Sequence, residues 1–194
     1  VKTIGLENIP AEGAAILVGN HSGVLPVDAF MLLQAVIHHH PQPRRIRCLS
    51  HDYLIESDVF KDIVRGFGGV PAKYSVALKL LENNELVCFY PEGAKGTGKP
   101  FSMRYRLVDF NPGFIKAAIE KNVPIIPITT VGADEVYPLF CNLKAVAKFM
   151  DAPYWPITGA FPWLPFPFSC MPLPVKMLIK IGEPIYLDYP KDKY

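Results

Sequence analysis

Three short apolar runs constrain the fold of this chain more than any other feature of its sequence. Each is short and continuous, as expected of a strand covered on both faces, and they occupy residues 14–18, 86–90 and 123–131. Between them, apolar side chains recur at helical spacing in residues 29–39, 74–82 and 113–121. This alternation predicts right-handed βαβ units, and so an α/β fold with a mostly parallel central sheet flanked by helices.

Weaker patterns fill the intervals between these elements. Residues 44–50 predict a strand, and Ser50 or Asp52 is placed to cap a helix that runs through Arg65. The glycine-rich residues 66–71 predict a turn with a very short strand, and residues 94–110 a long basic loop. Two closing strands are expected, at residues 175–182 and 185–187.

The length of 194 residues fits a single domain, residues 1–194. We divide it into a motif-bearing core (residues 1–132), a segment rich in proline and aromatic residues (133–175) and closing strands (176–194). The sequence opens at Val1 without a signal peptide, which leaves room for a membrane anchor in flanking segments.

Charge and cysteine usage exclude several classes of function. The net charge of +2 gives no general affinity for polyanions, so we expect no nucleic-acid partner. The four cysteines lack the CxxC spacing of structural zinc sites, which favours a reduced, cytosolic compartment. The histidine triplet 38–40 falls at a predicted helix end, where cationic side chains suit the helix dipole, so we expect no metal site.

The loop at residues 19–28 carries the first candidate chemistry. His21 and Asp28 lie between a predicted strand and a predicted helix, where open α/β sheets bind ligands. A histidine oriented by a carboxylate can act as a general base. Six residues separate the pair, and Gly23 and Pro26 within this insert allow the loop to bulge and return Asp28 to His21.

Two further motifs follow in order: a Tyr-Pro-Glu-Gly-Ala-Lys turn at residues 90–95 and a Val-Pro-Ile-Ile-Pro strand at residues 123–127. Together with Asn20, His21 and Asp28, they resemble the motifs of the glycerolipid acyltransferase family (PlsC-like; lysophosphatidate and other lysophospholipid acyltransferases). A glycine-rich family motif is matched only loosely, by residues 68–73. The chain departs from the family pattern in two places, since the family usually has four residues between His and Asp, and an Arg where Lys95 stands.

The resemblance implies an O-acyltransferase of phospholipid biosynthesis that needs no cofactor. His21, oriented by Asp28, would take the proton from a lipid hydroxyl as it attacks an acyl-CoA or acyl carrier protein thioester, with backbone N–H groups holding the oxyanion. The substrate-binding residues would be Glu92 and Gly93, which shape the acceptor site, and the cations Lys95, Lys99 and Arg104, which hold anionic groups.

Two other functions stay open at this stage. One is a non-catalytic lipid-binding module of the same fold, and the other is a thioesterase or lipase-like hydrolase that uses water in place of the alcohol. Ser22 lies beside His21, but the Gly-x-Ser-x-Gly elbow of α/β-hydrolases is absent from the sequence.

Residues 152–175 predict a surface that meets lipid. These 24 positions carry no charge but contain seven prolines, which argue against a transmembrane helix. Six aromatic residues favour the headgroup level of a bilayer, and lysines flank the segment on both sides. We therefore expect the protein to act at the cytoplasmic face of a membrane, either peripherally or through an anchor outside this sequence; the alternative is that the segment covers the core of the domain.

Overall fold

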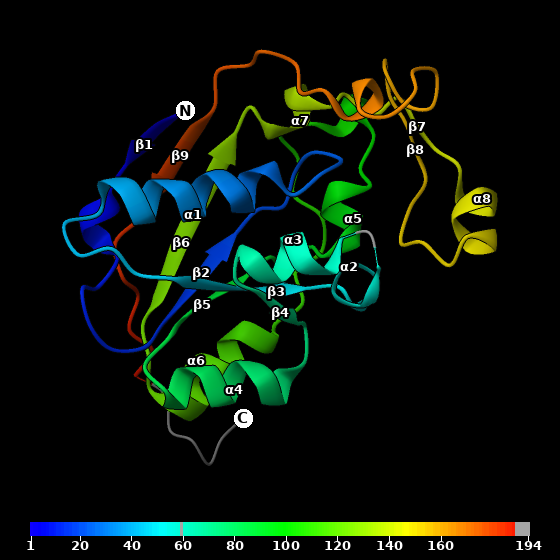
Figure 1. The fold of residues 1–194 in the computed structure, drawn as a ribbon. Helices are drawn as coiled ribbons and strands as arrows, with labels where there is room; N and C mark the ends of the chain where they lie inside the picture. Colours follow the sequence, from blue (N-terminus) through cyan, green and yellow to red (C-terminus); the bar gives the residue numbers. More distant parts are fainter. Residues whose placement is uncertain (59, 189–194) are drawn as a thin grey trace.

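The computed structural model describes residues 1–58 and 60–188, and within them a seven-stranded sheet lies at the centre (Figure 1). In spatial order its strands are β1 (Lys2–Ile4), β9 (Leu178–Ile181), β6 (Ile125–Val131), β2 (Ala15–Gly19), β5 (Leu86–Phe89), β3 (Ile46–Ser50) and β4 (Gly69–Pro71). The strands from β6 to β4 run parallel to one another. Only the β6–β9 pairing is antiparallel, so the sheet is mostly parallel, as predicted.

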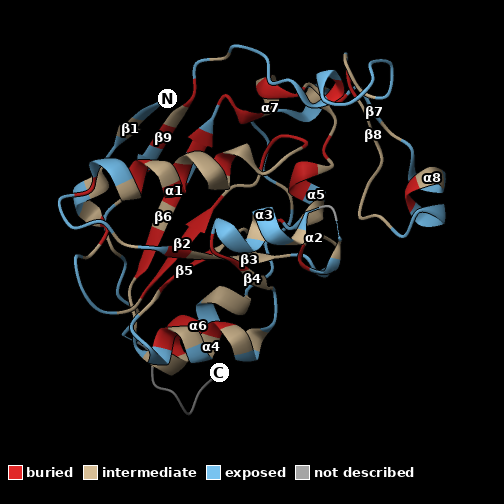
Figure 2. Cartoon of the chain, viewed as in Figure 1, coloured by how far each residue is buried: buried red, intermediate tan, exposed pale blue. Residues whose placement is uncertain are grey.

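The central strand β2 divides the core into two layers. All five of its residues are buried, and alternate side chains face opposite sides of the sheet. Ala15 and Leu17 join a cluster with Leu32 and Val36 of α1 (Val27–His39). On the other face, Ile16 and Val18 pack against α4 (Tyr74–Glu82) and α6 (Gly113–Lys121). Figure 2 shows the buried strands between these helices.

Helix boundaries depart from prediction where the loops make specific hydrogen bonds. α1 begins at Val27, two residues before the expected start at residue 29, so Asp28 lies in its first turn. The helix expected through Arg65 is interrupted and forms α2 (Asp52–Glu56) and α3 (Lys61–Gly66), because Ser57 is extended and ends α2. His51 caps α2, with its Nδ1 accepting from the Tyr53 N–H at 3.2 Å. Residue 59 lies outside the described residues.

Short elements also replace some of the predicted loops. The basic loop contains α5 (Ala94–Thr97) and the 3-10 helix η2 (Phe101–Met103), and α7 (Ala133–Val136) follows β6 directly. The edge strand β1 and the 3-10 helix η1 (Leu6–Asn8) have no clear sequence pattern. Ile185 forms an isolated bridge with Ile125 where a short strand was expected, and residues 189–194 lie outside the described residues.

The segment after α7 is built from small pieces. They are β7 (Cys141–Asn142), β8 (Pro156–Ile157), α8 (Lys144–Phe149) and the 3-10 helix η3 (Phe168–Cys170). β7 and β8 pair antiparallel in a second sheet, beside the main one in Figure 1. Among the described residues, none of the helices has both the length and the apolar character needed to traverse a bilayer.

Candidate active site

Strand pairing brings the motif-bearing loops together at one edge of the sheet. β2 pairs in parallel with β5 on one side and with β6 on the other. The loops that leave the carboxyl ends of these three strands therefore meet, and they carry His21, Glu92 and Asp134. This is the edge at which open α/β sheets bind ligands.

His21 and Asp28 form a hydrogen-bonded pair despite the six residues between them. His21 Nδ1 lies 2.8 Å from Asp28 Oδ2. The Asp28 side chain is fully buried, and that of His21 is 16% exposed. Asp28 also accepts from the N–H groups of Ser22 (3.1 Å) and Ala29 (2.8 Å), which fixes its carboxylate. An Nδ1–H that donates to Asp28 leaves Nε2 as the proton acceptor, which is the arrangement of a general base.

The insert returns to Asp28 through a glycine turn. Gly23 has a φ of +86°, and a β-carbon there would lie 2.7 Å from the Ala133 carbonyl oxygen. Its N–H donates to Asp134 Oδ1 at 3.1 Å. The turn therefore needs glycine both for its backbone conformation and for its close approach to α7.

The His21 ring is held by close packing on neighbouring loops. It stacks on Tyr90, with ring centroids 4.3 Å apart. Burial raises the pKa of the Tyr90 phenol well above its ordinary value, so the ring beside His21 stays neutral. On the α5 side, a β-carbon at Gly96 would lie 2.7 Å from the His21 carbonyl oxygen. These contacts leave the imidazole little freedom to rotate.

Glu92 joins the His21 loop to the basic segment. It is almost fully buried; Oε1 accepts from the His21 N–H and Oε2 from the Val108 N–H, each at 3.0 Å. Its carboxylate thus orients two backbone segments around the site. The neighbouring Gly93 is exposed and has a φ of +54°, a conformation that favours glycine.

The three predicted cations occupy different environments. Lys95 is exposed on α5, whereas Lys99 is buried and its Nζ donates to the Arg106 carbonyl at 3.0 Å. Lys99 Nζ also lies 3.8 Å from Asp134 Oδ2. Arg104 is exposed, and its guanidinium lies 4.6 Å from the centre of the Phe101 ring. The structure therefore does not gather these cations into one anion site.

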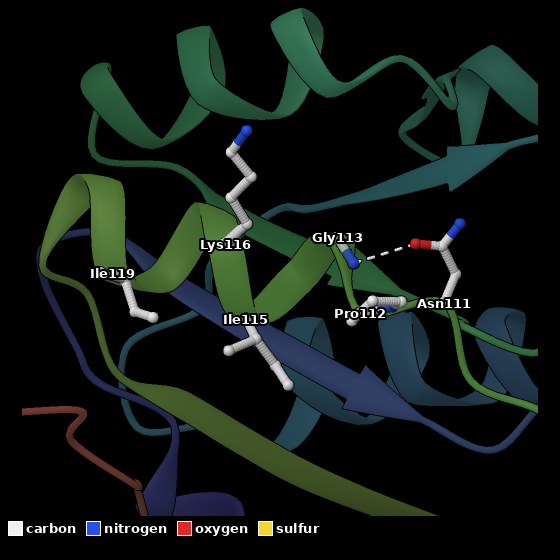
Figure 3. A pocket seen from close by; sticks show the side chains of 6 residues that line it. All are labelled: Asn111, Pro112, Gly113, Ile115, Lys116 and Ile119. Atoms are coloured by element: carbon white, nitrogen blue, oxygen red, sulfur yellow. Dashed lines mark hydrogen bonds between the residues drawn. The ribbon is translucent and has the colours of Figure 1, made fainter. Parts of the chain in front are cut away.

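Two surface hollows meet at Asn111. One, of about 370 Å³, is lined by Glu92, Gly93, Lys95 and Asp109, and so includes three of the predicted substrate-binding residues. The other, of about 410 Å³, lies over the first turns of α6 and is lined by Ile115 and Ile119 among others (Figure 3). Asn111 borders both, and its Oδ1 accepts from the Gly113 N–H. In the described part of the chain, acidic, histidine and cysteine side chains form no cluster that could hold a metal ion.

Several residues that shape the site were given no role in the sequence prediction. Asn20 bonds β6 twice, donating to the Thr130 carbonyl (3.0 Å) and accepting from its N–H (2.8 Å). Asp134 links Gly23 to Lys99. A role for Asn20 could have been predicted from its position beside His21 in the motif. The role of Asp134 can be recognised only once β2 and β6 are known to pair.

Comparison with known proteins identifies the family. A family model described as "Acyltransferase" matches residues 1–131, and the chain belongs to this family. An uncharacterized protein of Mycobacterium tuberculosis is 43% identical over 186 residues, which cover 95% of this chain and 52% of that protein. A bovine "DGAT1/2-independent enzyme synthesizing storage lipids" is 24% identical over 95% of this chain and 52% of its own length. The chain thus spans about half the length of these curated relatives.

The fold agrees with a solved structure of the same class. The crystal structure of the 1-acyl-sn-glycerophosphate acyltransferase PlsC from Thermotoga maritima matches with a TM-score of 0.56 at 18% identity. The match covers 99% of this chain and 63% of the PlsC chain. At this identity the likeness bears on the fold, and it confirms the predicted PlsC-like architecture.

Proposed function

We propose that this protein transfers a fatty acyl group from acyl-CoA or acyl carrier protein to a hydroxyl of a glycerolipid or lysophospholipid at a membrane surface. The observation that carries the proposal is the 2.8 Å contact between His21 Nδ1 and Asp28 Oδ2, in a chain of the acyltransferase family. A non-catalytic module has no need of an oriented, partly exposed histidine next to a buried carboxylate.

The transfer is direct and needs no acyl-enzyme intermediate. His21 Nε2 removes the proton from the acceptor hydroxyl as its oxygen attacks the thioester carbonyl, and Asp28 stabilises the imidazolium that forms. The tetrahedral intermediate then collapses, the carbon–sulfur bond breaks, and the thiolate takes the proton from His21. The products are an ester and a free thiol. The negative charge on the intermediate's oxygen is met by backbone N–H groups other than those of His21, Ser22 and Gly23, because these three already donate to Glu92, Asp28 and Asp134.

The hollow lined by Glu92, Gly93 and Lys95 is the proposed site for an anionic part of a substrate. Lys95 is exposed at its rim and can meet a phosphate as a point charge. Glu92 acts here mainly by holding the backbone of His21 and Val108. Lys99 has its partners within the protein, so Lys95 is the main candidate among the three cations.

The membrane surface is proposed to contact residues 163–173. Large apolar side chains in this stretch are exposed, among them Trp163 (68%) and Phe166 (82%). Aromatic rings favour the interface between headgroups and acyl chains. α8 contributes exposed Phe149 together with the exposed lysines Lys144 and Lys148, which suit anionic lipid. By contrast, Tyr154 and Val175 pack on a separate cluster of buried apolar residues, which includes Val24, Val136 and Tyr137. Only part of the segment therefore covers the core.

Incubation with radiolabelled acyl-CoA or acyl carrier protein, and with lysophospholipid or diacylglycerol in vesicles, tests the reaction. Labelled lipid product supports transfer, and His21→Ala should lower its rate by roughly 10³-fold or more. His39→Ala is the matched control, because His39 is exposed at the far end of α1. Free fatty acid as the sole product would identify a hydrolase, and transfer that survives His21→Ala would overturn the catalytic assignment.

Vesicle flotation tests the membrane contact. The double change Trp163→Ser and Phe166→Ser should weaken binding to anionic vesicles by about 10-fold or more, since each ring adds a large apolar area to the contact. Tyr186→Ser is the control, because Tyr186 is equally exposed but lies outside the segment. Equal binding of all three proteins would remove residues 163–173 from the proposed interface.

A further inference from the structure

The insert between His21 and Asp28 is packed against the segment that follows the motif-bearing core. Val24, at the middle of the insert, is only 7% exposed and belongs to a cluster with Val136, Tyr137 and Leu139. Leu25 and Val27 lie against the same cluster, and so do Tyr154 and Val175. The loop that bears the dyad therefore gains its apolar support from residues 133–177 and not only from the central sheet.

Tyr154 makes a directed contact to this insert. Its hydroxyl donates a hydrogen bond to the Val24 carbonyl. Burial raises the pKa of the Tyr154 phenol, so the hydroxyl keeps its proton at neutral pH. Tyr154 also lies close to Gly98, the residue that follows α5: a β-carbon at Gly98 would lie 3.3 Å from Tyr154 Cβ. Tyr154 therefore lies between the His21 loop and the helix whose Gly96 packs against His21.

The other hydrogen bonds of the loop hold its two ends, and Tyr154 holds its middle. Asn20 fixes the start of the loop to β6, and the Gly23 N–H is held by Asp134. Asp28 is fixed in the first turn of α1. Among the described residues, the hydrogen bond from Tyr154 to the Val24 carbonyl is the one side-chain hydrogen bond that reaches the loop between Gly23 and α1.

We propose that Tyr154 is a positioning residue, which holds the insert in the conformation that brings the Asp28 carboxylate to the His21 ring. The proposal rests on the proposed function, in which His21 is the general base. It also gives the segment 133–177 a role in catalysis, because the same segment carries the exposed aromatic residues and braces the loop of the dyad. Tyr154 itself takes no part in the chemistry.

A pair of tyrosine-to-phenylalanine variants tests this role. Tyr154→Phe removes the hydroxyl and keeps the ring. Tyr137→Phe is the matched control, because Tyr137 lies in the same cluster and its hydroxyl donates to the Cys170 carbonyl, at 2.8 Å, away from the His21 loop. Tyr154→Phe should lower kcat by about 10-fold with the acyl-donor KM within about twofold, since small displacements of a catalytic group are costly. Tyr137→Phe should leave both constants near those of the unaltered protein.

A second measurement does not depend on activity. The Nδ1 proton of His21, held by Asp28, should give a downfield NMR resonance that is protected from exchange. Tyr154→Phe should shift it or speed its exchange, and Tyr137→Phe should not. If the unaltered protein transfers no acyl group, the proposed function fails, but this resonance still decides whether Tyr154 positions the dyad.

Val24→Ala changes the loop side of the same contact. It provides a second test in case Tyr154→Phe folds poorly. It keeps the Val24 carbonyl but removes the two methyl groups that pack the insert against the cluster, so kcat should fall here as well. Unaltered kcat and an unaltered His21 resonance in either folded variant would overturn the proposal. The same conclusion would follow if Tyr137→Phe reproduced the losses of Tyr154→Phe, because the effect would then be a general loosening of the cluster.

Discussion

In the His21 loop the side chains of Asn20, His21 and Asp28 are hydrogen-bonded to protein groups, whereas the basic segment at residues 94–110 divides its cations between solvent and interior. The Ser22 hydroxyl is buried and has no hydrogen-bond partner among the described residues. Asn20 binds the backbone of Thr130, and Asp28 binds His21 and two backbone N–H groups. In the basic segment, Lys95 and Arg104 are exposed while Lys99 is buried. The side chains of the first region are therefore held by the protein, whereas the second region leaves part of its positive charge in contact with solvent.

The contrast is sharpest between Lys95 and Lys99, which lie four residues apart. A buried ammonium requires close partners, because removing it from water is costly. Lys99 has two, the Arg106 carbonyl and the Asp134 carboxylate, and it thereby connects the basic segment to α7. Lys95 keeps its hydration and its freedom to move. The same residue type is thus bound within the protein at one position and exposed to solvent at the other.

Replacing the buried carboxylate of the fixed region should have the largest effect. Asp28→Asn keeps the size of the side chain but removes the charge that orients the His21 ring and stabilises the imidazolium. We expect kcat for acyl transfer to fall by roughly 10³-fold, with substrate KM values little changed. Steady-state kinetics with a saturating acyl donor measures this effect.

Asp58→Asn is the matched control for that change, because the Asp58 side chain is 92% exposed and lies far along the chain from the dyad. Its kinetics should match those of the unaltered protein. An active Asp28→Asn variant would show that the 2.8 Å contact is structural and that His21 works without it.

Lys99→Met tests whether the buried cation stabilises the fold. The change leaves the Asp134 carboxylate without its cation in a mostly buried setting, so the free energy of unfolding should fall by about 3 kcal/mol. Lys95→Met should change it by less than about 0.5 kcal/mol, as is usual for an exposed position. Urea unfolding followed by circular dichroism measures both. A loss of substrate affinity without a loss of stability in Lys99→Met would return Lys99 to the substrate site.

How far the sequence alone predicts this molecule depends on the range of the interactions involved. The buried strands and the helices α4 and α6 have local signals, apolar runs and helical spacing, and these elements were predicted closely. The ordered motifs also indicated the family correctly. The strand order follows less directly, because β1 and β9 are short and their pairing joins distant parts of the chain.

The candidate site shows the same division. His21 and Asp28 are close in sequence, and the glycine and proline of the insert indicated that the loop could fold back. The sequence near Lys95 and Lys99 does not show which of the two side chains is buried. Both follow the same turn, and they differ only in the residues that the fold brings next to them. Tyr154 contacts Val24 across 130 positions of the sequence, and the proline pattern around it gives no indication of that partner.

The exposed lysine should show the smallest effect, and one confined to binding. Lys95→Ala removes a point charge from the rim of the hollow lined by Glu92 and Gly93, so the KM of an anionic substrate should rise about fivefold while kcat stays unchanged. Lys95→Arg should restore the lower KM, since it returns the charge, and Lys79→Ala on the distant helix α4 should have no effect. Raising the salt concentration should shrink the difference between Lys95→Ala and the unaltered protein, because an exposed charge is screened. A fall in kcat for Lys95→Ala would instead mean that Lys95 acts in the chemical step together with the His21 loop. Arg104 would then be the remaining exposed cation of the three that could act in binding alone.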